Sequence, residues 1–243
     1  MGATVSMVDD GALGVFASTA AIPAVGMNAT GTVVVAGSDN SIVTDAGEMT
    51  YVAEAAETAP DGTLLWSVQL SAPPPPAHYT SASPSSVSAA VDPAGDAFVL
   101  NAWQWLDNDT GDAIAINPGN VARVSAAGHV VWTATTTNDV RPAGAFSVGP
   151  LLALDTADDT FVGGTLTGSA TFGAVGAVTS AGPEDAAFAV YDASGVLRSA
   201  GTWGAPGEST TLGSIATDGS AILLAGTASS DSATDVFVVT VGW

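Results

Sequence analysis

Short apolar runs separated by polar turns recur along the whole chain. No segment carries a sustained apolar period of about 3.6 residues, which an amphipathic helix would need. Asp, Asn and Gly fill the breaks between the runs, and these residues favour tight hairpin turns. The pattern therefore predicts an all-β protein.

One recurring unit is an apolar run, a four-residue turn and a second apolar run. Its copies lie at 24–37, 88–102, 151–164 and 213–226. The last residues of the four turns are Gly31, Gly95, Asp158 and Gly219. Successive turn ends are therefore 64, 63 and 61 residues apart. Such even spacing indicates tandem supersecondary units.

A second hairpin follows each first one. Its copies lie at 4–18, 53–70, 120–134 and 187–201. Glycine at the end of each turn supplies the positive φ that a tight hairpin requires. Trp66 and Trp132 take the same place after their turns, with Phe16 nearby, and we interpret all three as aromatics that pack between sheets.

Two hairpins per repeat give four strands, which is the number in one propeller blade. The chain starts at a second hairpin (4–18) and ends with a first hairpin plus one strand (235–243), so we expect the two ends to complete one blade and close the ring by strand pairing. Repeats of about 62 residues nearly exhaust the chain. The prediction is a single β-propeller domain over 1–243 with four four-stranded blades. Five blades remain the alternative, because segments 4–8 and 236–241 compete for one strand position.

The last third of the chain resembles a known group. The stretches FGAVGAVTSAGPEDAAFAVYDASG (172–195) and LGSIATDGSAILLAGTAS (212–229) are similar to the SBBP-type bacterial β-propeller repeat. The similarity extends over about 172–240 and is degenerate over 24–134. It implies a secreted or surface-anchored bacterial protein with a binding or scaffold role, and it carries over no catalytic residue. A weaker resemblance to quinoprotein propellers rests on LDNDTGDAI (106–114) and HVVW (129–132).

The charge balance excludes several partners. There are 24 acidic residues against three arginines and no lysine, for a net charge of -21. Such a surface repels nucleic acid and anionic lipid, while it keeps an apolar, small-residue surface in solution. No apolar run approaches the about 20 residues of a membrane helix, so we expect no membrane insertion. No cysteine is present and no secretion signal is visible, so either the protein stays inside the cell or this is a mature chain with an added Met1. The SBBP resemblance implies the second, an extracellular or periplasmic location.

The sequence contains few residues of the types that usually act as catalytic bases or nucleophiles. His78 and His129 are the two histidines; His78 lies in a Pro/Ser-rich stretch, and His129 directly follows a turn glycine. Most carboxylates fall in hairpin turns that favour Asp for local hydrogen bonds. Acids outside those turns, with Glu48, Asp185 and Asp235 as examples, are the ones a hydrolase would use. We predict that the protein is not an enzyme.

The segment Asp107-Asn108-Asp109-Thr110-Gly111-Asp112 lengthens the second repeat. Alternating oxygen side chains with a glycine for the bend suit Ca²⁺, so Asp107, Asp109 and Asp112 are candidate ligands, with a plain acidic loop as the alternative. The segment is not an EF-hand, because the downstream glutamate and the helices are missing.

Trp103 and Trp105 alternate along one strand and therefore point the same way. They either pack in the sheet interface or, together with Tyr79, form an exposed aromatic surface for a glycan or a protein. The leading functional hypothesis is a non-catalytic interaction module on a bacterial exterior that binds a glycan or protein. The alternatives are a structural or assembly subunit and, third, a carboxylate hydrolase or a degenerate quinoprotein.

Overall fold

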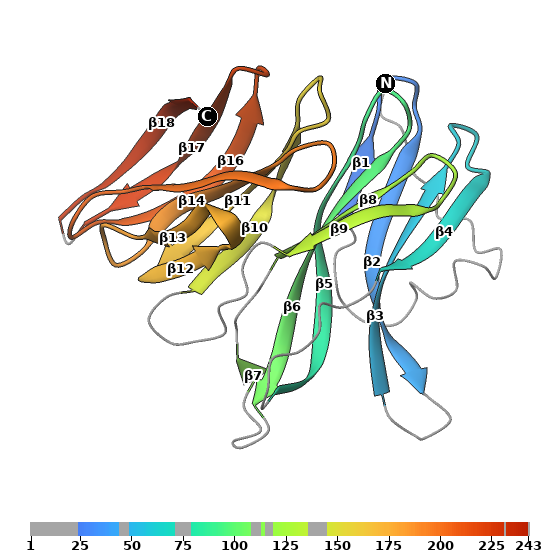
Figure 1. Ribbon diagram of the computed structural model, residues 1–243, viewed down its shortest axis with the longest axis horizontal. Helices are drawn as coiled ribbons and strands as arrows, with labels where there is room; N and C mark the ends of the chain where they lie inside the picture. The colour runs from blue at the N-terminus through green and yellow to red at the C-terminus, as the bar shows by residue number, and fades with distance from the viewer. Residues whose placement is uncertain are drawn as a thin grey trace.

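The protein is built from antiparallel β-sheets, as the sequence pattern predicts (Figure 1). The structure, a computed structural model, describes residues 24–43, 49–70, 79–107, 113–114, 119–135, 145–230 and 232–242. A single turn of 3₁₀ helix, η2 (Gly173–Val175), is the one helical element in these residues. The all-β fold class is therefore confirmed.

The first two sheets each contain two hairpins in chain order. The first sheet has the order β1-β2-β3-β4, with strands Ala24–Met27, Val33–Val43, Met49–Thr58 and Leu64–Leu70. The second has the order β5-β6-β8-β9, with strands Tyr79–Val91, Ala97–Asp107, Gly119–Val124 and Val130–Thr135. The short strand β7 (Ala113–Ile114) pairs with the far end of β6.

The third and fourth sheets follow the same plan. The third has the order β10-β11-β14-β15, with strands Ala145–Leu154, Thr160–Thr167, Asp185–Tyr191 and Leu197–Trp203. A small hairpin of β12 (Ser169–Phe172) and β13 (Gly176–Thr179) is inserted between its two hairpins. The fourth has the order β16-β17-β18, with strands Ser209–Thr217, Ala221–Ser229 and Thr234–Gly242.

The predicted hairpins are found wherever the described residues include them. The four first hairpins are β1-β2, β5-β6, β10-β11 and β16-β17, and three second hairpins are β3-β4, β8-β9 and β14-β15. Positive φ angles at the turn ends match the glycine pattern, with 87° at Gly31 and 94° at Gly95. Asp158 takes this conformation without being glycine, at a φ of 63°. The predicted hairpin at 4–18 lies outside the described residues.

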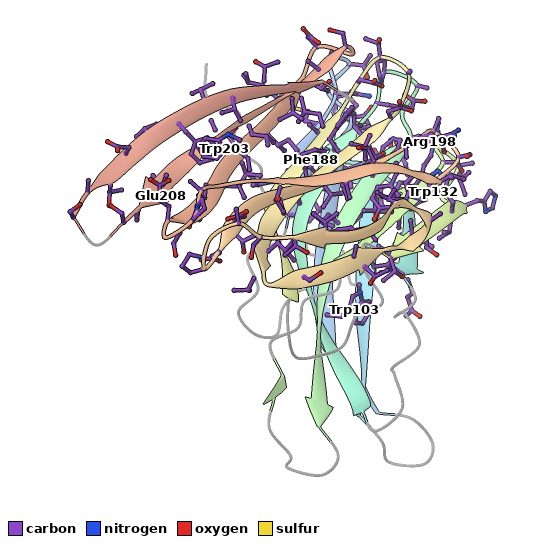
Figure 2. The ribbon with its side chains drawn as sticks, turned by 60° about the vertical axis from the view of Figure 1, so that its left-hand side comes forward. Trp103, Trp132, Phe188, Arg198, Trp203 and Glu208 are labelled. Carbon is purple, nitrogen blue, oxygen red and sulfur yellow. The ribbon has the colours of Figure 1, made fainter. Side chains whose placement is uncertain are left out.

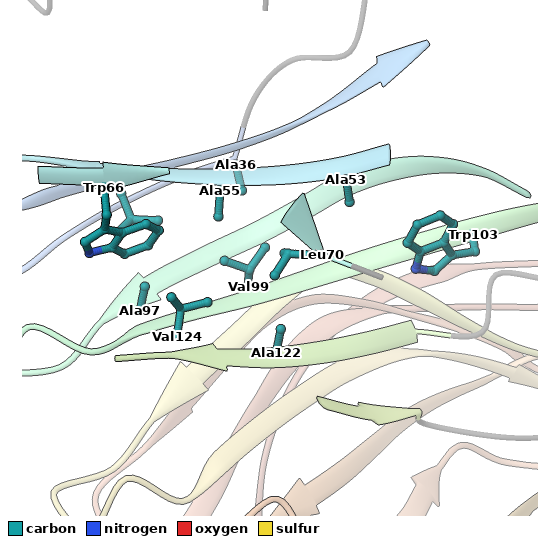
Figure 3. Close-up of a cluster of buried hydrophobic side chains, with 11 residues drawn as sticks. Ala36, Ala53, Ala55, Trp66, Leu70, Ala97, Val99, Trp103, Ala122 and Val124 are labelled. Carbon is teal, nitrogen blue, oxygen red and sulfur yellow. The ribbon is translucent and has the colours of Figure 1, made fainter. Parts of the chain in front are cut away.

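Successive sheets pack face to face, and the two sides of each sheet have different neighbours. We call the side that contacts the preceding sheet its upstream side and the opposite side its downstream side. The downstream side of the first sheet, with Ala36 and Ala55, shares one buried cluster with the upstream side of the second, which carries Val99 and Ala122 (Figure 3). Strand alternation separates these two sides residue by residue.

The same relationship repeats twice along the chain. Leu100 on the downstream side of the second sheet belongs to one cluster with Val162 and Ala189 of the third. Phe161 on the downstream side of the third sheet belongs to one cluster with Leu224 of the fourth. Most sides of the sheets are covered by a neighbouring sheet, so the central strands are apolar on both faces. The strand β14, for example, is buried at every position.

The four sheets form an open series in the described residues. In Figure 1 the sheet β1–β4 and the sheet β16–β18 lie at opposite ends of the molecule. The structure therefore supports the coarser prediction, a series of antiparallel sheets built from tandem hairpins. In the part of the chain that is described, no helix has the length and apolar character needed to cross a bilayer.

Candidate functional site

Each sheet places a polar residue at the same point, where its first strand enters the first turn. These residues are Asn28, Asp92, Asp155 and Asp218, spaced by 64, 63 and 63 residues. Each side chain accepts hydrogen bonds from the backbone of its own turn: the Asp155 Oδ1 atom accepts from Ala157 N at 2.8 Å and from Asp159 N at 2.9 Å. The Asp92 Oδ1 atom likewise accepts from Asp96 N at 2.8 Å. The local preference of Asx residues for turns explains the repetition.

Three of these turns meet around one cavity of about 400 Å³. Each of the second, third and fourth sheets contributes three consecutive residues to it. The lining residues are Val91, Asp92, Pro93, Leu154, Asp155, Thr156, Thr217, Asp218 and Gly219. Because the three segments occupy equivalent positions, the cavity has one carboxylate from each of three repeats. Its polar lining is therefore acidic, and Thr156 and Thr217 add hydroxyl groups to it.

The deepest carboxylate of the cavity belongs to Asp92, which is 2 % exposed. Its Oδ2 atom is buried and accepts no hydrogen bond from the described residues. The nearest cation is the Arg123 guanidinium, with Nη2 at 3.8 Å from Asp92 Oδ2. The same Nη2 lies 2.9 Å from Asp96 Oδ2 and 3.1 Å from Asp158 Oδ2. One arginine thus faces three carboxyl groups.

Arg123 also ties the second sheet to the third. Its Nη1 atom donates a hydrogen bond to the Ala193 carbonyl at 3.1 Å, and its guanidinium carbon lies 5.2 Å from the centre of the Phe98 ring. The Trp132 Nε1 atom donates to the same carbonyl at 3.0 Å. Figure 2 shows Trp132 beside the third-sheet hairpin that carries Arg198. Arg123 and Trp132 therefore fix the 192–195 turn against the second sheet.

Local hydrogen bonds favour the ionised form of two turn carboxylates, Asp218 and Asp192. Donation from Ser220 to Asp218 lowers the pKa of that carboxyl. Donation from the Ser194 hydroxyl, with further backbone bonds and the Arg198 guanidinium, lowers the pKa of Asp192 to about 2. Glu57 is the opposite case, because burial raises its pKa and the charges of Asp96 and Asp92 add to the increase. Asp218 is therefore the cavity carboxyl whose ionised form is favoured by its own turn.

Trp103 belongs to the core and not to an exposed aromatic surface. Its side chain is fully buried in the cluster between the first and second sheets, at the end remote from Trp66 (Figure 3). Of the two alternatives that alternation left open, packing is the correct one for this residue. The reason is that the first sheet covers the upstream side of β6 from Ala97 to Trp103.

The other predicted binding and metal residues lie near the far end of β5 and β6. Tyr79 and Asp107 are cross-strand partners there, and Trp105 is paired with Ala82 on the same ladder. The backbone thus brings one predicted aromatic residue and one predicted calcium ligand to the same end of the second sheet. Asp109 and Asp112 lie outside the described residues. The aromatic surface of Tyr79 and Trp105 and the calcium loop both stay predictions.

The described residues contain no group of three or more His, Cys, Asp or Glu side chains that could hold a metal ion. The three cavity carboxylates, Asp92, Asp155 and Asp218, therefore do not form such a group. Their geometry is that of separate turn residues and not of a shared coordination sphere. A metal at the 107–112 loop would have to use ligands that lie partly outside the described residues.

Two of the acids that a hydrolase would use, Asp185 and Asp235, lie among the described residues. Asp185 is fully buried, and its carboxylate accepts hydrogen bonds from Ala181 N at 2.7 Å and Gly182 N at 3.1 Å. Asp235 and His129 are exposed. Glu48 and His78 lie outside the described residues.

The cavity and the Arg123 cluster were not predicted from the sequence. The available signal was the recurrence of Asp92, Asp155 and Asp218 at intervals of 63 residues, which we interpreted as turn chemistry alone. Tandem repeats bring equivalent positions to one end of the molecule, so evenly spaced polar residues indicate a shared surface as well as a shared turn type.

The chain matches no protein-family model, and no curated protein matches its sequence.

Proposed function

We propose that the protein is a non-catalytic interaction module on a bacterial exterior, extracellular or periplasmic, which binds a glycan or a protein partner in the turn cavity. The observation that carries the proposal is that the cavity is lined by equivalent residues of three repeats: three successive sheets each contribute the same three positions to it. Carboxylates and hydroxyls at its rim accept hydrogen bonds from sugar hydroxyls or from the basic side chains of a protein.

The same proposal includes the finer description of the fold. The chain forms a β-propeller of about four four-stranded blades, with five as the alternative, and pairing between N- and C-terminal strands closes the ring. The 107–112 loop binds Ca²⁺ through Asp107, Asp109 and Asp112. Three sheets with four long strands each, which pack in series, support this description, as does the second edge of β18, which has no strand partner among the described residues.

The test is a glycan array and a partner screen with the whole chain, followed by calorimetry on the hits. The double variant Asp155→Asn and Asp218→Asn removes two rim charges while an amide oxygen still accepts the turn hydrogen bonds. We expect its binding to be at least about tenfold weaker. The control is Asp61→Asn with Asp235→Asn, which makes the same charge change at exposed positions outside the cavity. Equal losses in both variants would show that net charge, and not the cavity, governs binding.

A structural or assembly function is the second candidate. It is favoured by one specific observation, the exposed apolar side chains at the two ends of the series: Val25 and Met27 on β1, and Val236 and Val238 on β18.

A further inference from the structure

The four equivalent first turns differ in one respect that the turn itself does not require. The opening position is asparagine in the first sheet, at Asn28, and aspartate in the other three, at Asp92, Asp155 and Asp218. The Asn28 Oδ1 atom accepts from Thr30 N at 3.1 Å and from Thr32 N at 3.0 Å, which are the same two turn positions that donate to Asp155. An amide group therefore satisfies this turn as well as a carboxyl group does.

The three aspartates are the ones that line the cavity. The lining comes from the second, third and fourth sheets, and no described residue of the first sheet contributes to it. The opening position thus carries a carboxyl group where it lines the cavity and an amide where it does not. Because the turn accepts either group, turn chemistry does not account for the three carboxyl groups.

One cavity residue has an acceptor atom that no described residue uses. Asp92 is 2 % exposed, and its Oδ1 atom accepts from Asp96 N at 2.8 Å, whereas its Oδ2 atom is buried and accepts no hydrogen bond. The nearest cation, Arg123 Nη2, lies 3.8 Å from that Oδ2 atom and closer to Asp96 and Asp158. A buried carboxyl oxygen without a donor is unfavourable. The Asp92 Oδ2 atom therefore indicates a ligand that donates hydrogen bonds at this end of the cavity.

The three carboxyl groups lie at different depths. Asp92 is buried, Asp155 is half-buried and Asp218 is exposed. The side chains of Leu154 and Pro93 add apolar surface to the same lining. Lysine and arginine side chains combine an apolar stem with a charged end that donates hydrogen bonds. A basic side chain of this kind matches both the depth of the cavity and its mixed lining.

The carboxyl groups also favour a ligand with positive charge. Donation from Ser220 lowers the pKa of Asp218, and an ionised carboxyl group accepts hydrogen bonds but donates none. Burial, together with the charges of Asp155 and Asp192, raises the pKa of Asp159, which follows Asp155 in the same turn. Carboxylates around the third-sheet turns thus repel one another, and a cationic ligand would reduce that repulsion.

The described residues do not supply such a cation to the cavity. Arg123 is paired with Asp96 and Asp158, and Arg198 is paired with Asp192. The chain has no lysine, and none of the described residues that line the cavity is basic. We therefore look for the cation on another molecule.

Two other classes of ligand fit the cavity less well. A metal ion needs oxygen atoms that converge on one point, and the three carboxyl groups do not form such a group. A flat sugar or base stacks on an aromatic ring, and none of the described lining residues is aromatic. A guanidinium group, in contrast, spreads five N–H donors around one plane and can bond to carboxyl groups from separate turns.

We propose that the cavity binds an arginine side chain of a protein partner. The guanidinium group lies at the Asp92 end and bonds to Asp92 and Asp155, while the aliphatic stem follows Leu154 toward the exposed Asp218. This inference rests on the proposed function, because it names the partner of the same cavity as a protein with an exposed arginine and not a glycan. The net charge of -21 attracts such a partner over a long range.

The test uses two capped pentapeptides that differ in one group. One has arginine between two pairs of glycines, and the other has citrulline, which has nearly the same shape but no charge. Each peptide is titrated into the whole chain at one fixed ionic strength, and binding is followed by calorimetry or NMR. We expect the arginine peptide to bind at least about tenfold more tightly. Equal binding of the two peptides, or no binding of the arginine peptide at millimolar concentration, overturns the proposal.

Single substitutions separate the cavity from general charge attraction. Asp92→Asn and Asp155→Asn keep the turn acceptor, as Asn28 shows, and each should weaken binding of the arginine peptide at least about tenfold. The control is Asp61→Asn, because Asp61 also accepts a hydrogen bond in its own turn, from Thr63 N at 2.9 Å, but is exposed and does not line the cavity. Melting temperatures verify that each variant is folded. An equal loss in the control overturns the proposal.

Two further ligands distinguish this inference from the proposed function. A glycan that binds the chain and is lost in Asp155→Asn would support the cavity as the binding site while it overturns the arginine. Spermidine tests a small free cation, and binding as tight as that of the arginine peptide would also overturn the protein side chain as ligand. If Asp155→Asn and Asp61→Asn bind every ligand equally well, the cavity itself is not the site and both proposals fail.

Discussion

Trp132 lies against Gly195 so closely that no side chain fits between them. A Cβ atom on Gly195 would lie 2.6 Å from Trp132 Cδ2, which is well inside van der Waals contact. The Trp132 indole also donates its hydrogen bond to Ala193, two residues earlier in the same turn. One side chain of the second sheet, Trp132, therefore holds the turn of the third sheet in place. This contact is possible because Gly195 has no Cβ atom.

The substitution Gly195→Ala should destabilise the protein more than Gly207→Ala does. Both glycines have a φ near 80°, so both alanines carry a left-handed backbone cost of about 1–2 kcal/mol. Only Gly195 has a ring against it, whereas a Cβ atom at Gly207 would meet nothing within 4 Å. We expect an additional loss of about 1–3 kcal/mol for Gly195→Ala, measured by denaturant unfolding. Equal losses would mean that Trp132 moves aside at no cost.

Replacing Arg123 by methionine should cost about 3 kcal/mol in free energy of unfolding. The change leaves the carboxylates of Asp92, Asp96 and Asp158 without their shared cation in a mostly buried site. Arg198→Met is the matched control, because Arg198 pairs with Asp192 but its side chain is 61 % exposed. We expect the control to cost less than about 1 kcal/mol. A similar cost for both variants would contradict the importance of the Arg123 cluster.

Glu57→Gln should stabilise the protein at neutral pH, and the gain should disappear in acid. Burial raises the pKa of Glu57 in the folded state, so the folded protein holds its proton more tightly than the unfolded chain. Stability then falls as pH increases from the unfolded pKa through the folded one, and it stays low above both. Glutamine removes this penalty. Melting temperatures of both proteins between pH 4 and 8 test the prediction, which fails if the difference between them does not change with pH.

Calcium should raise the melting temperature if the 107–112 loop binds it. A ligand that binds only the folded state stabilises it in proportion to the logarithm of its concentration. We expect a calcium-specific increase that EDTA reverses and that Asp107→Asn with Asp109→Asn abolishes. The control is the same titration in high monovalent salt, which screens charge repulsion without filling a site. A melting temperature that increases strongly with monovalent salt but does not change with calcium would exclude the metal site.

The fold class and the hairpins could be predicted from the sequence because they depend on neighbours along the chain. Turn residues such as Gly95 and Asp155 act through their own φ angles and their own backbone hydrogen bonds, so a local pattern is sufficient. The repeat spacing then predicts how many hairpins are present and in what order they occur. The position of Trp103 did not follow, because a strand with a sheet on both sides is apolar on both faces, and alternation then says nothing about exposure.

The sequence by itself therefore determined strands, turns, repeat length and the excess of negative charge, all of which are local or additive properties. Only the tertiary structure decided which repeats meet. Arg123 binds Asp96, Asp158 and Ala193, which are 27, 35 and 70 residues away in the chain. The cavity of Asp92, Asp155 and Asp218 exists only because three turns converge. The physical reason is that stacking of whole sheets, and not the preference of any single residue, sets the distances between repeats.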